Sequence, residues 1–320
     1  MTASKNYKES PASFRDRLTF RVSLKSPMKT ESTAPSGFQA LVDAAGAAIN
    51  SIKINGVSAG QHRGHPVRIK TRLQGSESIA GLANLFFKMC DAHITVLADP
   101  KEWQRWEIVC YQLLNGDQFQ AFAKGSRTVC QETVPGRNLR DLLKSGSLCR
   151  PALEAAAREI RRAHLIPCRE YDGPWSHGDM HMGNVIYDES SNRARLIDFE
   201  IVHNKSRETR TRHADDLLVF LQDMVGRVTG RQWLPLSFCF LQAYGRPRVI
   251  GHLRTLLEIP KGIPGIWWEI RSHYCERAKL RRRIKALAHA LDAWAKADDR
   301  TPRSPTAVRH TAPTLAARVQ

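Results

Sequence analysis

Alternating polar and apolar residues predict several short strands in the first half of the chain. Residues 66–72 alternate in this way, and a period of two is typical of a half-buried strand. Residues 119–124 and 127–133 predict two further strands. Residues 51–54 also alternate, and the Asn55-Gly56 pair that follows predicts a hairpin turn, with a glycine-containing loop over 57–64.

Apolar residues spaced three and four apart predict helices elsewhere in the chain. Residues 100–114 begin with Pro100 and stop before Asn115-Gly116, which are start and stop signals for a helix. The same spacing or a small-residue-rich composition predicts further helices over residues 37–49, 82–89 and 151–165, from His213 to Val225, and over most of 231–297.

The most informative stretch runs from Trp175 to His203. Residues 184–187 and 194–197 each read as a strand, and a polar turn over 188–192 joins them. Asp179, Asn184 and Asp198 stand at the ends of this small hairpin, so folding can bring them together. Phosphoryl transfer needs an acid that orients the attacking hydroxyl and oxygen ligands that hold Mg²⁺. Asp179 suits the first task, and Asn184 and Asp198 suit the second.

The same stretch resembles the kinase-like superfamily. This group holds protein kinases, aminoglycoside phosphotransferases, choline/ethanolamine kinases and bacterial lipopolysaccharide core kinases. The matching pattern is HGDxHxxN at residues 177–184, followed by IDFE at 197–200. The resemblance covers about residues 50–225 and implies an α+β, bilobal protein-kinase-like fold, in which a small N-terminal sheet lobe joins a larger, mainly helical lobe. It also implies ATP and Mg²⁺ as cofactors.

Further roles follow from this resemblance. A strand-borne lysine pairs with phosphate oxygens in the superfamily, and Lys70 lies in such a strand, with Lys88 as the alternative. A helix glutamate pairs with that lysine; Glu107 matches this position, and Glu102 is the runner-up.

The segment that links the two lobes in the superfamily resembles residues 132–143 here. Glu132 and Val134 are therefore expected beside the adenine. Glu200 is expected to help hold the metal ions or to cap its turn. Asp216 is expected to cap a helix and bind the catalytic-loop backbone, and His164 is expected to be structural.

Two departures bear on the acceptor. Protein kinases carry arginine before the catalytic aspartate and lysine two residues after it, whereas this chain has Gly178 and His181. Both changes resemble the small-molecule and lipopolysaccharide kinases, so a protein acceptor and regulation by loop phosphorylation are not expected.

Composition divides the chain into four parts. Residues 1–36 are rich in Ser, Thr, Lys and Pro and predict a disordered tail. Residues 37–135 form the predicted N-terminal lobe and 136–297 the C-terminal catalytic lobe. Residues 298–320, rich in Pro, Thr and Arg, predict a second disordered tail.

The charge favours anionic partners. Formal net charge is +18 and the pI is near 10.0. Residues 277–285 are strongly basic and predict peripheral contact with an anionic membrane. The sequence lacks the aromatic-basic motifs and zinc spacings that indicate specific nucleic-acid binding. Seven scattered cysteines without a CxxC pair predict a reducing, cytoplasmic setting. The basic charge predicts that the protein lies in part at the periphery of the inner membrane.

The leading hypothesis is an ATP-dependent kinase that phosphorylates a hydroxyl of a non-protein acceptor, such as a lipopolysaccharide core sugar, another glycolipid or a small molecule. The alternatives are a Ser/Thr protein kinase, an inactive scaffold of kinase fold and, on charge alone, a nucleic-acid binder. The complete set of Asp179, Asn184 and Asp198 weighs against the scaffold.

Overall fold

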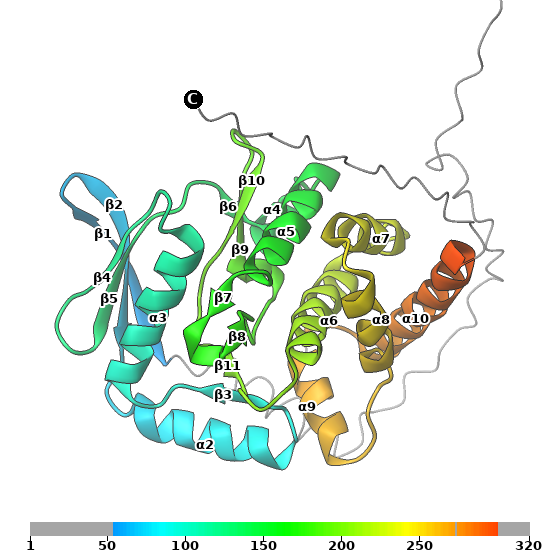
Figure 1. Ribbon diagram of the computed structural model, residues 1–320, viewed down its shortest axis with the longest axis horizontal. Helices are drawn as coiled ribbons and strands as arrows, with labels where there is room; N and C mark the ends of the chain where they lie inside the picture. The colour runs from blue at the N-terminus through cyan, green and yellow to red at the C-terminus, as the bar shows by residue number, and fades with distance from the viewer. Residues whose placement is uncertain (1–53, 273, 300–320) are drawn as a thin grey trace, which may run out of the picture.

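A four-stranded antiparallel sheet lies at one end of the molecule (Figure 1). The computed structural model describes residues 54–272 and 274–299, so the predicted helix over 37–49, the predicted tail over 1–36 and all but the first two residues of the predicted tail over 298–320 lie outside the described residues. The sheet is built, in spatial order, from β1 (Asn55–His62), β2 (His65–Arg72), β5 (Thr128–Glu132) and β4 (Ala121–Ala123). The strand predictions over 66–72, 119–124 and 127–133 are therefore confirmed.

The predicted turn at Asn55-Gly56 is wrong, because both residues belong to β1. Asn55 pairs with Arg72 and Gly56 with Thr71 along the ladder, and the turn lies eight residues later, at Arg63-Gly64. The stretch 57–62, expected as a loop, is strand. A continuous ladder with β2 satisfies more backbone groups than a two-residue turn would, and this outweighs the local turn preference.

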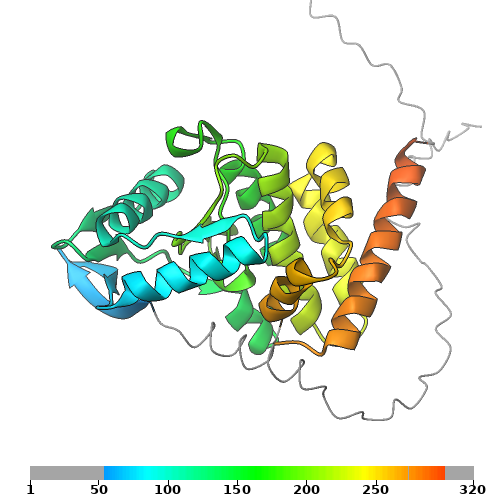
Figure 2. The ribbon, with the colours of Figure 1, turned by 90° about the horizontal axis from the view of Figure 1, so that it is seen from below.

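Two helices accompany the sheet. Helix α3 (Pro100–Asn115) packs on β4 and β5, and Asp99 caps it by accepting a hydrogen bond from the Glu102 amide at 2.7 Å. Helix α2 (Ser76–Met89) packs on the short strand β3 (Ile94–Val96). That strand pairs with β11 (Ile201–His203), more than a hundred residues away in sequence. The view from below shows α2 running from the sheet toward the helical part (Figure 2).

Helices fill the rest of the molecule. They are α4 (Leu139–Lys144), α5 (Arg150–Ala163), α6 (Thr209–Arg227), α7 (Trp233–Tyr244), α8 (Pro247–Leu256), α9 (Ile263–Arg271) and α10 (Arg277–Asp299). Helix α6 is buried along most of its length and contacts α7, α8 and α10. The α+β class is therefore confirmed. Helix α10 ends at Asp299, two residues into the predicted C-terminal tail.

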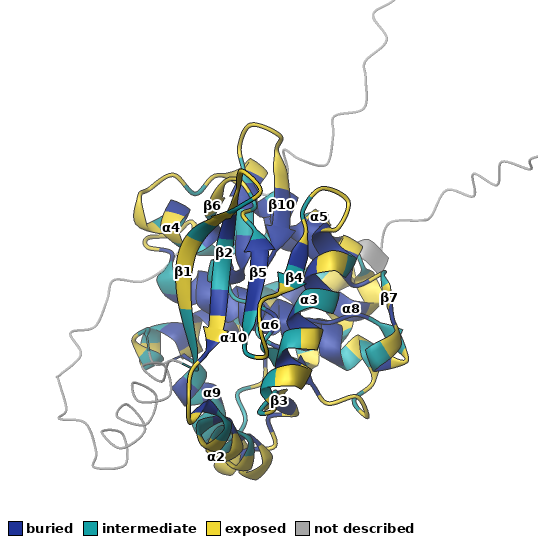
Figure 3. Cartoon of the chain, turned by 90° about the vertical axis from the view of Figure 1, so that its left-hand side faces the viewer, coloured by how far each residue is buried: buried dark blue, intermediate teal, exposed yellow. Residues whose placement is uncertain are grey.

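Small sheets lie between the large sheet and the helices. Strands β9 (Val185–Asp188) and β10 (Arg193–Leu196) form the predicted hairpin, and β6 (Arg137–Asn138) pairs with β9. Strands β7 (Pro167–Cys168) and β8 (Gly173–Pro174) form a two-stranded pair. Burial grades across the large sheet, from an exposed edge at β1 to a buried β5 (Figure 3).

The basic run at the start of α10 is not one exposed surface. Arg283 is buried and donates hydrogen bonds to the carbonyls of Val225 at 2.7 Å and Val228 at 2.6 Å. Arg281 pairs with Glu269, which leaves Arg282 as the exposed member of this triplet without an ion pair among the described residues. The arginines of this run therefore do not share one exposed surface, and the contact of residues 277–285 with an anionic membrane stays a prediction. Within the described ranges, no helix is long and apolar enough to cross a bilayer.

Candidate active site

Lys70 lies at the centre of a buried charge cluster. Alternation along β2 turns it away from the solvent face, and it is 3% exposed. Its ammonium Nζ lies 2.6 Å from Glu107 Oε1 and 2.7 Å from Asp198 Oδ1. Burial lowers the pKa of Lys70, but the two carboxylates more than reverse this and raise it above its ordinary value, so the side chain is cationic.

Glu107 is held from three sides. It is fully buried on the inner face of α3. Besides Lys70, its Oε1 accepts a hydrogen bond from the Gln131 amide group at 3.0 Å, and its Oε2 accepts one from the Phe199 backbone N–H at 3.1 Å. One helix carboxylate therefore ties the sheet to the segment that carries Asp198.

Asp198 follows β10 at a backbone position that few residues adopt, with φ 71°. Its enclosed position would raise the pKa of its carboxyl, but the charge and hydrogen bond of Lys70 lower it to about 2. Asp198 Oδ2 accepts no hydrogen bond within the described chain. It is thus an ionised carboxylate with one oxygen engaged and one available.

The turn from His177 to Asn184 lies against the same segment. The Ile197 N–H donates to the Asn184 carbonyl at 3.0 Å, and His177 Nε2 lies 3.1 Å from the Ile197 carbonyl. The Asn184 amide group donates to the Asp179 carbonyl at 2.9 Å. These bonds bring the predicted residues Asp179, Asn184 and Asp198 into one neighbourhood, as the hairpin prediction requires.

The residues present fit a magnesium ion in their chemistry. The side-chain nitrogen of Asn184 donates its hydrogen bond to the Asp179 carbonyl, whereas Asn184 Oδ1 accepts no hydrogen bond from the described residues. This amide oxygen and Asp198 Oδ2 are hard ligands of the kind that Mg²⁺ prefers, and Mg²⁺ is usually held by few protein oxygens together with substrate phosphates. In the described ranges no three His, Cys, Asp or Glu residues cluster as a metal site, so a purely protein-built cage is not present there.

Asp179 is the more open acid of this turn. Its side chain is 32% exposed, and Oδ2 lies 3.6 Å from His181 Nε2. Its carboxylate accepts no hydrogen bond shorter than this contact in the described part of the chain. The backbone around it is fixed instead: the carbonyl of Asp179 accepts from His181 N–H at 2.9 Å as well as from Asn184.

Asp216 organises the turn from below, as the resemblance implies. It is fully buried inside α6, seven residues after the helix begins, and accepts hydrogen bonds from the backbone N–H groups of His177 at 2.8 Å and Gly178 at 2.9 Å. The prediction that Asp216 caps its helix is wrong, because α6 begins earlier than expected and Glu208 stands at the N-cap position. His164 Nε2 lies 3.0 Å from the same carboxylate. Burial raises the pKa of Asp216, but the surrounding histidines, His203 foremost, hold it below its ordinary value. His164 is buried between Asp216 and the Tyr244 hydroxyl, a position that suits its expected structural role.

Gly178 is required by the backbone. Its φ is +90°, and a Cβ at this position would lie 2.7 Å from the carbonyl oxygen of Ile201. Only glycine fits both constraints without strain. The absence of an arginine here is therefore built into the path of the chain.

Glu200 faces a different set of partners. Its Oε2 accepts from the Asn55 amide group and lies 3.7 Å from Arg72 Nη1. Burial, followed by the charge of Asp198, raises the pKa of Glu200 to about 7. Its bonded oxygen thus joins Glu200 to β1 and β2, and its expected role at a metal ion stays a prediction.

The two residues expected beside adenine lie at the end of β5 and in the segment after it. Every polar group of Glu132 has a partner: its carboxylate and N–H bond to Gln120, and its carbonyl accepts from the Tyr111 hydroxyl. Val134 instead lines a cavity of about 240 Å³ together with Phe119 and Ile186. Neither residue belongs to the Lys70 cluster.

The alternatives that the sequence left open lie elsewhere. Lys88 is exposed on α2 and has no ion pair among the described residues. Glu102 is exposed in the first turn of α3. The structure thus brings Lys70 and Glu107 to Asp198 and leaves Lys88 and Glu102 at the surface.

Sequence reasoning missed the supporting residues of the site. Asp223 on α6 is buried and accepts from the Met182 N–H at 3.0 Å and from Arg140 at 3.2 Å, so it fixes the turn that carries Asn184. An acid inside the buried stripe of α6 was a usable signal. Gln131 and Asn55 carry no such signal, because their partners are distant in sequence.

Comparisons with known proteins find likenesses among solved structures. No family model and no curated protein sequence matches the chain. Among solved structures, it is similar to the Plasmodium vivax ethanolamine kinase Pv091845, with a TM-score of 0.42 and 10% sequence identity, over 77% of this chain and 84% of that one. Similarity at this level does not identify what the chain acts on.

Proposed function

We propose that the chain is an ATP-dependent phosphotransferase with a kinase-like, two-lobed arrangement. The observation that carries this proposal is the position of Lys70, which is buried between Glu107 and Asp198. The three residues come from β2, α3 and the segment after β10, which are far apart in sequence. The two carboxylates hold the Lys70 ammonium in place, and a phosphate oxygen could replace Asp198 as one of its partners. The adjoining turn supplies an open acid at Asp179 and an oxygen ligand at Asn184.

The proposed division of roles follows from these environments. Asn184 Oδ1 and Asp198 Oδ2 would hold Mg²⁺, which when bound neutralises charge on the phosphates. Lys70 would bind phosphate oxygens as a fixed cation. Asp179 would accept the hydrogen bond of the acceptor hydroxyl and take its proton. Val134 would lie beside the adenine. Glu132 would instead hold Gln120 and Tyr111 in place through its hydrogen bonds.

We further propose a non-protein acceptor with a free hydroxyl, such as a glycolipid sugar or a small alcohol. The conformation of Gly178 supports this, because no arginine can stand before Asp179 to couple it to a phosphorylated loop. His181, 3.6 Å from Asp179, occupies the position where a lysine would be needed in a protein kinase.

The test is an ATP-consumption screen with the wild-type chain and the Asp198→Ala variant. Candidate acceptors are sugars, glycolipids, aminoglycosides and generic protein substrates, each with and without Mg²⁺. We expect acceptor-dependent ADP release from the wild type in Mg²⁺ with a hydroxyl-bearing non-protein acceptor, and none from Asp198→Ala. Full turnover by the variant would contradict the metal assignment, and tight MgATP binding without turnover on any acceptor would favour the inactive scaffold.

A further inference from the structure

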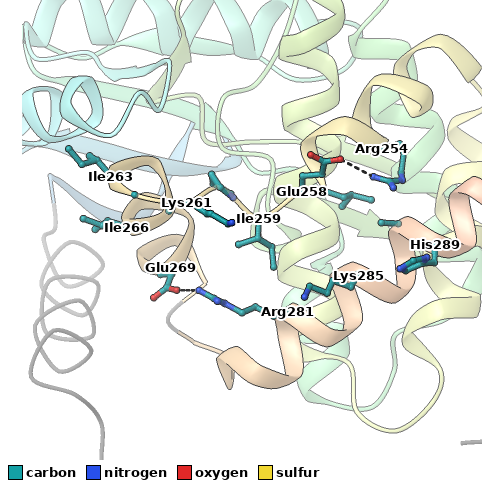
Figure 4. Close-up of a pocket in the computed structure, with 15 residues that line it drawn as sticks. Arg254, Glu258, Ile259, Lys261, Ile263, Ile266, Glu269, Arg281, Lys285 and His289 are labelled. Atoms are coloured by element: carbon teal, nitrogen blue, oxygen red, sulfur yellow. Dashed lines mark hydrogen bonds and ion pairs between the residues drawn. The ribbon is translucent and has the colours of Figure 1, made fainter.

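A groove opens between α9 and the first half of α10, and it takes no residue from the candidate active site (Figure 4). Its cavity measures about 1010 Å³, at the upper end of the roughly 300–1,000 Å³ that small-molecule sites occupy. The walls come from the end of α8, the turn between α8 and α9, the first turns of α9 and one face of α10. A feature of this size outside the reaction centre needs its own explanation.

One wall of the groove is apolar. Ile259, Ile263 and Ile266 line it from the α8–α9 turn and the start of α9. Ile263 is 53% exposed at the rim, whereas Ile259 and Ile266 are half-buried. Apolar side chains that line a concave site and keep part of their surface exposed indicate a ligand with an apolar part.

The facing wall carries the cations Arg281 and Lys285. These two residues and His289 follow each other at intervals of four along α10, so they share one helix face. Lys261 adds a further cation from the α8–α9 turn. Figure 4 shows these side chains on the two sides of the groove.

The two carboxylates of the groove do not neutralise these lysines. Glu269 is engaged by Arg277 at 2.5 Å and by Arg281. Glu258 lies 3.8 Å from Arg254, which itself forms a two-point contact with Asp292 at 2.8 and 2.9 Å. Lys261 and Lys285 are left without a hydrogen-bond or ion-pair partner in the described ranges.

An anion in the groove would supply the missing charge. A phosphate accepts from several ammonium donors at once, which suits two lysines on separate elements better than a neutral ligand does. The uncapped first turn of α9 faces the same space and adds a weak positive end. The charge favours a phosphate head, and the isoleucine wall favours a hydrocarbon chain attached to it.

We propose that this groove binds a single-chain anionic lipid, with its phosphate between Lys261 and Lys285 and its chain along Ile259, Ile263 and Ile266. This goes beyond the proposed phosphotransferase, since the groove shares no residue with the cluster around Lys70. It also replaces the continuous basic surface expected from the sequence with one discrete site.

The test is calorimetric titration of the full chain, without nucleotide, with dodecyl phosphate below its micelle concentration. We expect binding of one molecule per chain. Lys261→Ala and Lys285→Ala should each weaken it about fivefold, because each cation near an anionic lipid contributes about 1 kcal/mol. Both lysines are exposed and have no hydrogen-bond or ion-pair partner among the described residues, so the variants should fold normally.

Matched control variants show whether binding depends on the groove or only on the overall charge and exposed apolar surface of the protein. Arg282→Ala removes an exposed charge from the same helix outside the groove and should change the affinity less than twofold, which is within about 0.5 kcal/mol. Ile263→Asn should weaken binding, whereas Leu82→Asn, which alters an apolar residue 69% exposed on α2, should not.

Further ligands decide among other occupants. Inorganic phosphate bound as tightly as dodecyl phosphate would reject the lipid in favour of free phosphate, and dodecyl maltoside bound as tightly would reject the role of charge. A poly-glutamate peptide that binds more tightly than dodecyl phosphate would point to an acidic protein partner. Unchanged affinity in the Lys261→Ala/Lys285→Ala double variant would overturn the site itself, whatever the outcome of the kinase assays.

Discussion

Asp216 and Asp179 lie on opposite sides of the same turn and have opposite surroundings. Asp216 is fully buried, and both of its oxygens accept hydrogen bonds, from the backbone of His177 and Gly178 and with His164 alongside. Asp179 is 32% exposed, and its nearest recorded partner is His181 at 3.6 Å. A carboxylate whose two oxygens both accept hydrogen bonds from the protein can fix a loop but is not available to a substrate. A carboxylate with unbonded oxygens is available to a substrate but stabilises the loop little. The turn thus divides support and chemistry between two aspartates.

The largest expected effect comes from removing the open acid. Asp179→Asn should lower phosphoryl transfer about 10²–10⁴-fold, the usual contribution of a positioned proton acceptor. MgATP affinity should be nearly unchanged, because Asn184 and Asp198 keep their oxygens. The paired measurement is calorimetric ATP affinity and the transfer rate on the acceptor found by the screen. Lost ATP binding would show that Asp179 supports the site, and the contrast with Asp216 would fail.

Removing the buried acid should act on the fold. Asp216→Asn should cost about 3–5 kcal/mol of unfolding free energy, the range for breaking a buried charge network, since the amide cannot accept from both backbone N–H groups and satisfy His164. Urea denaturation measures this loss. Asp179→Asn is the matched control and should stay within about 0.5 kcal/mol of wild type, as exposed substitutions do. Equal losses in the two variants would remove the distinction between them.

Lys70 is expected both to stabilise the fold and to contribute to phosphoryl transfer, so it combines the roles that the two aspartates divide. Lys70→Ala should cost about 2–4 kcal/mol of transition-state stabilisation, as loss of a preorganised charge does, while Lys88→Ala on the exposed face of α2 should have little effect. Kinetic assays of both variants rank the two lysines. The variant also leaves Glu107 buried without its cation, so a Lys70→Met/Glu107→Gln double variant should regain stability without regaining activity. A double variant that stays as unstable as Lys70→Ala would argue against the pair.

The smallest expected effect is on the dependence of stability on pH. Burial lowers the pKa of His164, His177 and His213, the last to about 2, from the ordinary 6.5. Below pH 6.5 the unfolded chain therefore binds up to three protons that the folded chain does not. The unfolding free energy thus decreases as the pH decreases. Glu200, whose pKa is raised to about 7, takes up one proton in the folded state and opposes this.

The excess of protons on the unfolded chain should lower the unfolding free energy as the pH falls from 6 to 5. Urea midpoints at several pH values measure the slope. His289→Gln, which changes an exposed histidine, should leave the slope as it is. A stability that rises steadily from pH 6 to pH 5 would show that the three histidines are not held neutral.

The sequence predicts the elements of the site better than its support. Lys70 could be placed on a strand because β2 alternates, and Glu107 on a helix because Pro100 and the apolar spacing of α3 are local signals. The hairpin around Asp188 was equally visible. Each of these predictions depends on residues within about ten positions of one another, where periodicity carries information.

The failures have a common physical origin in long-range contacts. Asn55-Gly56 has turn chemistry, but pairing with β2 and the contacts of Asn55 with Arg72 and Glu200 decide its conformation. Arg283 belongs to a basic run, yet carbonyls of α6 and the segment after it take it inward. No local pattern reports such partners, because they are set by tertiary packing.

The pairing of β3 with β11 has a consequence for movement at the site. Leu196 ends β10 and Ile201 begins β11, so only residues 197–200 join two fixed ladders. Four residues span at most about 14 Å when fully extended, so this segment is a short tether with both ends fastened. Asp198 can swing outward only if one ladder unzips. The amide hydrogens of Leu196 and Val202 should therefore exchange as slowly as those of the core, and the segment that carries Asp198 should stay fixed rather than open and close.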